Sequence, residues 1–373
     1  MEIPVNKFSL TGNERKYVIE ALESGWISSD GPNVKEFEDK FSEFIGMKHG
    51  VTVTSGTVAL ELAVESLGIT KGDEIIVPTF TIISCVNAII KAGATPIFVD
   101  SEIDSWNMDT TKVESLISKS TKAIMPVHTY GLPANIEEIS RIAKKYNLYI
   151  IEDAAEAHGQ HFKGKKCGSF GDVSIFSFYA NKIITTGEGG IILTNSDSLA
   201  EKLRLLRNLS FETGRRFIHN QLSSNSRFTN IQAAIGLAQL EKIESTIQKK
   251  IQIGKTYSKY LKDNNRIQLP LSSSMGSPNH YWVYGIVLNK SLGLDNITMM
   301  RNLKQFGIET RPFFWPMHLQ PAITAKGYKQ NSDFPVSVVL ANQGLYLPSG
   351  IDTSIDEIAY CAKKVNELTT GLN

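Results

Sequence analysis

The stretch HGVTVTSGTVALELAVESLG, residues 49–68, joins a short apolar run rich in β-branched residues to a helical pattern. The run HGVTV is typical of a buried strand, and the apolar residues after Gly56 recur with helical spacing. The same alternation returns along the chain, with strand-like runs at 73–78, 95–100, 122–128, 148–155 and 172–178 and helical patterns at 81–93 and 135–147. It predicts an α/β fold with a mostly parallel sheet between helices.

Polar residues follow most of these strand-like runs. In open α/β sheets, ligands bind beyond the carboxyl ends of the strands. The candidate site residues are therefore those just after each run: Ser55, Gly56, Thr57, Thr79, Phe80, His128, Tyr130, Asp153, Glu156, His158 and residues 177–182.

The chain of 373 residues exceeds the size at which a single hydrophobic core stops growing. We expect a large domain at 1–245 and a smaller α+β domain at 246–373. The helical pattern at 231–263 predicts one long connecting helix, with the domain boundary near its middle.

The composition is that of an ordinary globular protein, with 42% hydrophobic and 21% charged residues. Lys and Arg number 39 against 38 Asp and Glu, a net charge of +1. No overall field would attract nucleic acid or an anionic membrane, so any anionic ligand must be bound by local groups.

The three cysteines, Cys85, Cys167 and Cys361, are widely scattered. An odd number without regular spacing suits reduced thiols in a cytosol, and we expect no metal site. The opening MEIPVNKFSL lacks the features of a secretory signal, and the most apolar stretch, residues 75–90, is interrupted by polar residues and Pro78. We therefore expect a cytoplasmic protein that does not enter a membrane.

Ser55, Gly56 and Thr57 lie where a strand turns into a helix. Backbone N–H groups at a helix N-terminus, beside two hydroxyls, can bind a phosphate. Taken alone, these three residues more often indicate a capped helix that binds no ligand.

Asp153 ends a strand too apolar to be exposed, and its carboxylate needs a partner. It could cap the next helix, or it could hold the ring nitrogen of a cofactor protonated. Lys182 follows the run FSFYAN and precedes the turn TTGEGG, so we expect it to point into a cleft and to form a Schiff base with a cofactor aldehyde. With Ser177 as a further phosphate donor, this order of residues suits pyridoxal 5′-phosphate. The glycine motifs of dinucleotide and P-loop sites are lacking.

On these residues the chain resembles the DegT/DnrJ/EryC1/StrS family of sugar-nucleotide aminotransferases, pyridoxal-phosphate enzymes of fold type I. The resemblance covers nearly the whole chain, through motifs that include VTSGTVALELAVESLG, GDEIIVPTFT, PVHTYGLPANI, IIEDAAEAHG, GSFGDVSIFSFYANKIITTGEGG, SSNSRFTNIQAAIG and RPFFWPMHLQP. It implies a seven-stranded sheet in the large domain, with pyridoxamine 5′-phosphate as the intermediate form of the cofactor.

The resemblance also implies roles for single residues. Lys182 would bind the cofactor covalently and move the proton, and Asp153 would bind the ring nitrogen. Gly56, Thr57 and Ser177 would bind the phosphate. Glu156 would lie near the O3′ atom of the ring, where many relatives carry glutamine.

Two further expectations concern the ring face and the partner subunit. Phe80 is expected to stack on the cofactor ring, although relatives often carry an aromatic residue where this chain has Ile82. Asn225 is expected to reach the phosphate of the neighbouring subunit, which implies a homodimer with shared active sites.

Relatives that replace the lysine with histidine are 3-dehydratases, so Lys182 favours transamination. The segments NHYWVYGIVL and ETRPFFWPMHLQP resemble those of members that aminate C4 of GDP-4-keto-6-deoxymannose with L-glutamate, a step toward surface polysaccharide such as O-antigen. Arg311, Phe313, Trp315 and His318 are the expected substrate-binding residues. Further candidates for binding the diphosphate are Arg215, Arg216 and Arg227.

Three alternatives stay open from the sequence. The substrate could be a UDP- or dTDP-linked keto sugar. The enzyme could be a pyridoxal-dependent sugar dehydratase, which would release a keto-deoxy product. A non-catalytic descendant that uses the fold for binding or regulation would be expected to lack Lys182 or Asp153.

Overall fold

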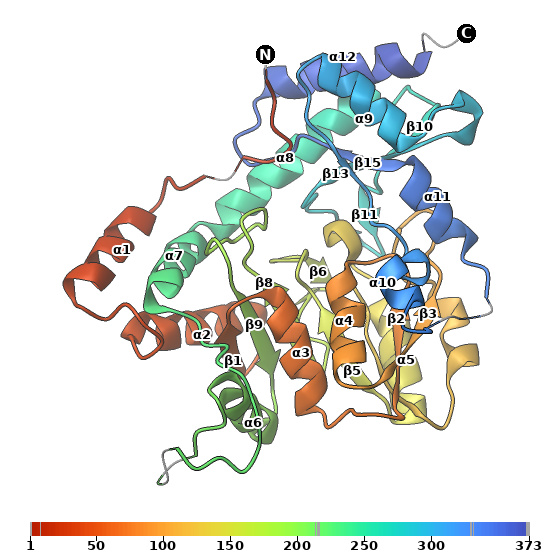
Figure 1. Cartoon of the computed structure of the whole chain (residues 1–373). Helices are drawn as coiled ribbons and strands as arrows, with labels where there is room; N and C mark the ends of the chain where they lie inside the picture. The colour runs from red at the N-terminus through yellow and green to blue at the C-terminus, as the bar shows by residue number, and fades with distance from the viewer. Residues whose placement is uncertain are drawn as a thin grey trace.

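The computed structural model describes residues 2–7, 9–212, 214, 217–328, 330 and 332–370. Its centre is a seven-stranded sheet in the order β1-β9-β8-β5-β4-β2-β3 (Figure 1). The strands are β1 (His49–Val53), β2 (Glu74–Pro78), β3 (Thr95–Val99), β4 (Thr121–Ile124), β5 (Tyr149–Asp153), β8 (Val173–Ser177) and β9 (Gly190–Thr194). Neighbours from β8 to β3 are parallel and β9 is antiparallel to both of its neighbours. The predicted mostly parallel α/β sheet is confirmed.

Two apolar layers cover the faces of this sheet. Side chains of α3 (Gly56–Ser66), α4 (Ile83–Lys91) and α6 (Asp197–Arg207) pack on one face, and those of α2 (Pro32–Ile45), α5 (Ile136–Tyr146) and α7 (Asn230–Glu241) on the other. The strands are apolar on both faces because both are covered. The helix α1 (Glu14–Glu23) packs against α7.

The C-terminal unit is built on a four-stranded antiparallel sheet in the order β10-β13-β15-β14. Its strands are β10 (Ile267–Gln268), β13 (Tyr284–Leu288), β14 (Arg311–Pro312) and β15 (Gly344–Leu347). The helices of this part of the chain are α8 (Ile243–Leu261), α9 (Asn296–Gln305), α10 (Pro321–Thr324), α11 (Pro335–Gln343) and α12 (Ile355–Thr370). Two small hairpins add β6 (His161–Phe162) with β7 (Lys165–Lys166), and β11 (Ser273–Ser274) with β12 (Ser277–Pro278).

The predicted long helix at 231–263 is wrong, because the structure divides it into α7 and α8 at Lys242. The backbone of Lys242 has φ −106° and ψ 4°, and its N–H bonds to Gln239 O at 3.2 Å instead of continuing the α-helical pattern. Both α7 and the start of α8, with Ile243 and Ile247, pack on the large sheet, and only the later turns of α8 join the core that contains α12.

The N-terminal segment does not follow the predicted division into domains at 1–245 and 246–373. Ile3 pairs with Ile308, and its side chain lies in the core of the C-terminal unit. Ser349 N–H also donates to Val5 O. Residues 2–7 therefore lie with the C-terminal unit, and the boundary near residue 245 stays a prediction for the rest of the chain.

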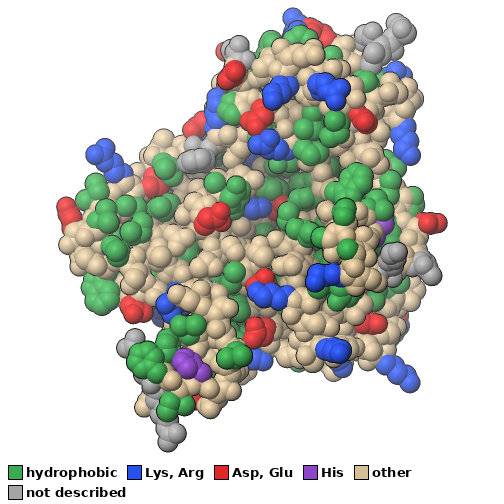
Figure 2. Space-filling model, in the orientation of Figure 1, with side chains coloured by type: hydrophobic (Ala, Val, Ile, Leu, Met, Phe, Trp, Pro, Cys, Tyr) green, Lys and Arg blue, Asp and Glu red, His purple; other side chains and the backbone are tan. Residues whose placement is uncertain are grey.

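The surface carries both signs of charge, and Figure 2 shows basic and acidic side chains interspersed on one face. Within the described ranges, no helix has the combination of length and apolarity that crossing a bilayer requires.

Candidate functional site

A cavity of about 360 Å³ opens at the carboxyl ends of the parallel strands. Residues that follow β1, β2, β4, β5 and β8 line it, as the alternation of strands and helices predicted. The C-terminal unit closes the other side with Trp282, Pro312, Phe314 and Tyr346. The cavity lies between the two sheets, so residues distant in sequence meet there.

One end of the cavity is a cradle at the start of α3. Ser55 is the N-cap of this helix and accepts a hydrogen bond from Val58 N–H at 3.2 Å. A Cβ on Gly56 would lie 2.7 Å from the Cβ of Ser177, so only glycine fits this close approach of helix and strand. Thr57 Oγ1 lies 2.8 Å from Ser84 Oγ. Hydroxyls and the N-terminal N–H groups of α3 therefore face the same space, an arrangement that suits a phosphate.

Asp153 lines the cavity from the end of β5, although only 2% of the residue is exposed. Its Oδ1 accepts a hydrogen bond from Ala155 N–H at 3.0 Å, and its Oδ2 accepts one from the Cys85 thiol at 3.1 Å. Burial raises the pKa of Asp153, because a carboxylate is costly in an apolar interior. A cationic group in the cavity would stabilise its charged form. No pattern in the sequence predicts the contact with Cys85.

Lys182 reaches the same cavity, and its side chain is 10% exposed. Its Nζ lies 3.5 Å from Glu156 Oε1 and 3.9 Å from the ring centre of Trp282. The indole N–H of Trp282 donates to Asn181 O at 2.9 Å. The lysine therefore points into a cleft, as its sequence context predicted, and Trp282 fixes the segment that carries it.

Glu156 is buried beside Lys182 and accepts a hydrogen bond from Tyr130 N–H at 2.8 Å. Burial raises the pKa of Glu156 to about 7, while the neighbouring Lys182 opposes this shift. Tyr130 adopts a left-handed backbone with φ 54°, and its hydroxyl accepts a hydrogen bond from Phe314 N–H at 3.0 Å. This strained residue thus links Glu156 to the C-terminal unit.

The structure does not place Phe80 at the cavity. Its side chain is 0% exposed and packs edge-on against Tyr130 and Phe314. Ile82, which is 41% exposed, lines the cavity instead. The turn after β2 directs Phe80 inward and Ile82 outward, so Phe80 cannot stack on a ligand there.

The expected substrate-binding residues of segment 311–318 lie outside the residues that line this cavity. Phe313 is buried against Trp106, and Trp315 is 45% exposed. Arg311 is exposed and pairs with Glu309 at 2.9 Å. Residues alternate in direction along this segment, which explains why Pro312 and Phe314 face the cavity and Phe313 does not.

His318 and Asn225 also lie outside the cavity lining. His318 Nδ1 is 2.7 Å from Thr79 Oγ1, and its ring packs against Phe334. Asn225 and Arg227 line an open groove of about 1030 Å³ on another part of the surface. Of the further candidates for the diphosphate, Arg215 and Arg216 fall outside the described residues.

The two histidines near the strand ends are buried. His158 lies among the rings of Phe41, Phe176 and Phe178, and burial lowers its pKa to about 3. His128 Nε2 lies 2.9 Å from Glu152, which also accepts hydrogen bonds from the backbone of residues 168, 170 and 171. These bonds tie the loop after β7 to the sheet. Both histidines therefore have packing or bonding roles.

The raised pKa of Glu156 predicts a pH-dependent stability difference for Glu156→Gln. Because the pKa of Glu156 is higher in the folded state, its contribution to stability is fully present below its unfolded-state pKa of about 4.5. This contribution is lost as the pH rises through the folded-state pKa of about 7. We expect the variant to gain stability over the wild type across this window, on the order of 3 kcal/mol at pH 8. Urea unfolding of the cofactor-free proteins between pH 5 and 8 measures the difference. The exposed Glu244→Gln is the control, and parallel profiles for wild type and Glu156→Gln would contradict the account.

Comparison with known proteins adds relatives that cover nearly the full length. Residues 9–366 match the DegT/DnrJ/EryC1/StrS aminotransferase family. The chain is 42% identical to the GDP-perosamine synthase of Vibrio cholerae, covering 97% of this chain and 98% of that one. It is 43% identical to the GDP-perosamine synthase of Escherichia coli O157:H7, covering 98% of both.

Among solved structures, the chain is similar to PseC of Helicobacter pylori, an aminotransferase involved in the biosynthesis of pseudoaminic acid. The two share 26% identity over 100% of both chains, with a TM-score of 0.93. The match extends over the sheet, the cavity and the C-terminal unit. The chain belongs to the DegT/DnrJ/EryC1/StrS aminotransferase family.

Proposed function

We propose that the protein transfers an amino group from L-glutamate to the C4 keto group of GDP-4-keto-6-deoxy-D-mannose and so forms GDP-perosamine. The proposal rests mainly on one observation: Lys182, Asp153 and the α3 cradle line the same cavity. Membership of an aminotransferase family and the names of two relatives above 40% identity support the reaction and the substrate. Surface polysaccharide such as O-antigen is the destination of the product, and the cytoplasm is the proposed location.

The residues present fit pyridoxal 5′-phosphate. The start of α3 with Ser55, Thr57 and Ser177 would hold the phosphate, and the buried carboxylate of Asp153 would hold a proton on the ring nitrogen. Lys182 offers the amine for the covalent bond to the aldehyde. When bound, this cofactor supplies a carrier for the amino group and a ring that takes up an electron pair.

Lys182 carries the proton transfers in this proposal. In the first half-reaction its amine takes the α-proton of L-glutamate, and in the second it donates a proton to C4 of the keto sugar. Glu156, 3.5 Å away, stabilises the ammonium form of the lysine between these steps. Since 2-oxoglutarate leaves before the sugar reacts, the kinetics are ping-pong.

Asn225 acts from a partner subunit in the proposed homodimer. It lies outside the cavity of its own chain, in a groove that also contains Arg227 and Ser28. Apolar side chains are exposed in the same part of the chain, with Leu222 at 95% and Ile218 at 56%. A second copy of the chain would cover them and bring Asn225 to the other phosphate cradle.

Lys182→Ala tests the covalent role by mass spectrometry and by activity. After borohydride reduction of the cofactor-loaded wild type, mass spectrometry should find the cofactor mass on the peptide that contains Lys182. The variant should remain folded, bind pyridoxamine phosphate and carry no such mass, and its activity should fall by at least about 10³-fold. Lys255→Ala on the exposed side of α8 is the control. Cofactor bound at another lysine in the wild type would remove Lys182 from this role.

Asn225→Ala tests the shared site through mixed dimers. The variant alone should bind the cofactor about tenfold more weakly, because one hydrogen bond to a charged group is lost. When it is mixed and refolded with Lys182→Ala, each heterodimer should contain one site with both native residues. Fluorescence titration should then find a fraction of sites with wild-type affinity. If Asn225 served its own chain, no such sites would appear.

A further inference from the structure

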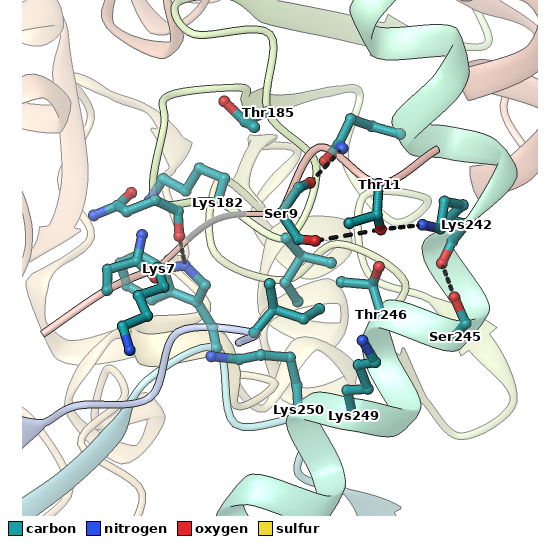
Figure 3. A pocket seen from close by; sticks show the side chains of 16 residues that line it. Lys7, Ser9, Thr11, Lys182, Thr185, Lys242, Ser245, Thr246, Lys249 and Lys250 are labelled. Carbon is teal, nitrogen blue, oxygen red and sulfur yellow. Dashed lines mark hydrogen bonds between the residues drawn. The ribbon is translucent and has the colours of Figure 1, made fainter. Parts of the chain in front are cut away.

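A second, smaller cavity of about 50 Å³ lies beside the first. The two share Asn181, Lys182 and Trp282 in their linings. The other walls of the second cavity come from the N-terminal segment and from the junction of α7 with α8. Figure 3 shows these segments side by side, with Lys242 bonded to Thr11 across them.

The lining of this second cavity is strongly cationic. Five of its 16 residues are lysines and none is an aspartate or glutamate; the lysines are Lys7, Lys182, Lys242, Lys249 and Lys250. Two of them have carboxylate partners, Glu357 for Lys7 and Glu156 for Lys182. For Lys242, Lys249 and Lys250, no carboxylate of the described residues lies within ion-pair distance. Lys249 is exposed and Lys242 is partly exposed, so water can solvate them, whereas Lys250 is buried without a counter-charge among the described residues.

Lys250 makes this imbalance costly. The residue is 5% exposed, and the one acceptor that its Nζ reaches among the described residues is Ser349 O. An ammonium group has three N–H donors, so two remain for a ligand. Burial lowers the pKa of Lys250 to about 7, which reflects the missing counter-charge. An anion in the cavity would stabilise the charged form of this side chain.

The hydroxyl groups in the lining and the volume of the cavity indicate which class of anion it can bind. The hydroxyls of Ser9 and Thr185 donate to Thr11 Oγ1 and to Phe178 O, whereas Thr246 adds a hydroxyl to the lysines. Ammonium groups beside a hydroxyl suit the oxygens of a phosphoryl group. A cavity of about 50 Å³ holds roughly three to five waters, which is close to the five heavy atoms of one phosphate.

We propose that this lysine cavity binds a phosphoryl group, supplied by the diphosphate of the nucleotide-linked substrate. The source rests on the proposed function, whereas the phosphoryl chemistry rests on the cavity alone. Because Lys182 and Trp282 belong to both linings, a sugar held at Lys182 has its phosphates close to the second cavity. Lys242, Lys249 and Lys250 would then be specificity residues for a nucleotide-linked over a free sugar.

Binding of GDP, guanosine and inorganic phosphate to the cofactor-loaded protein tests the proposal by calorimetry. Lys242→Ala and Lys249→Ala should each weaken GDP binding by roughly tenfold or more, because each removes a charge-assisted hydrogen bond. Their guanosine affinity should equal that of the wild type. Lys255→Ala, also on α8 but outside the cavity lining, should bind GDP normally. Lys250→Met should behave like the alanine variants, and these carry the test if Lys250→Met fails to fold.

The possible outcomes distinguish two questions: whether the cavity binds a phosphoryl group, and which molecule supplies that group. Weakened binding of both GDP and phosphate in the lysine variants supports the cavity and the substrate as the source. If the variants lose affinity for inorganic phosphate alone, the phosphoryl site holds and its ligand is a free anion. Unchanged affinity for both ligands overturns the proposal. L-glutamate alone should bleach the absorbance band of the bound cofactor in the wild type, without any nucleotide. An unchanged band would count against the proposed function and leave the GDP-binding result intact.

Discussion

The buried carboxylate of Asp153 is the constraint on which this candidate site depends. It is buried at the end of a central strand, where the described part of the chain donates two hydrogen bonds to its side chain and where burial raises its pKa. Such a group is stable in its charged form only beside a cation. The sheet order places the α3 cradle and Lys182 around the same cavity, so one ligand can satisfy the acid, the cradle and the lysine together.

The sheet and the centre of the site could be predicted from the sequence because their signals are local. Apolar strand runs followed by polar residues indicate both the strands and the edge where ligands bind. Ser55, Gly56, Asp153, Ser177 and Lys182 all follow or end such runs, and all line the cavity. The break between α7 and α8 was missed, since the helical pattern of the sequence continues through Lys242, where the backbone leaves the helical conformation.

The rest of the site depends on contacts between distant segments. Trp282 and Tyr346 reach the cavity only after the C-terminal sheet folds against the large one. Phe313 and Phe314 are neighbours in sequence, yet one joins the core and the other faces the cavity; a one-residue difference in register decides between them. The lysines at 242, 249 and 250 resemble ordinary helix-surface charges in the sequence, and they form a cavity only together with the N-terminal segment.

The most direct measurement follows the absorbance band of the bound cofactor during sequential addition of the two substrates. L-glutamate should bleach the band and release 2-oxoglutarate, and GDP-4-keto-6-deoxy-D-mannose should then restore it with formation of GDP-perosamine. This result would establish both half-reactions and the identity of the sugar substrate in a single experiment. Bleaching that this sugar cannot reverse would contradict the proposed substrate, and a band that glutamate leaves unchanged would contradict glutamate as the amino donor in this cavity.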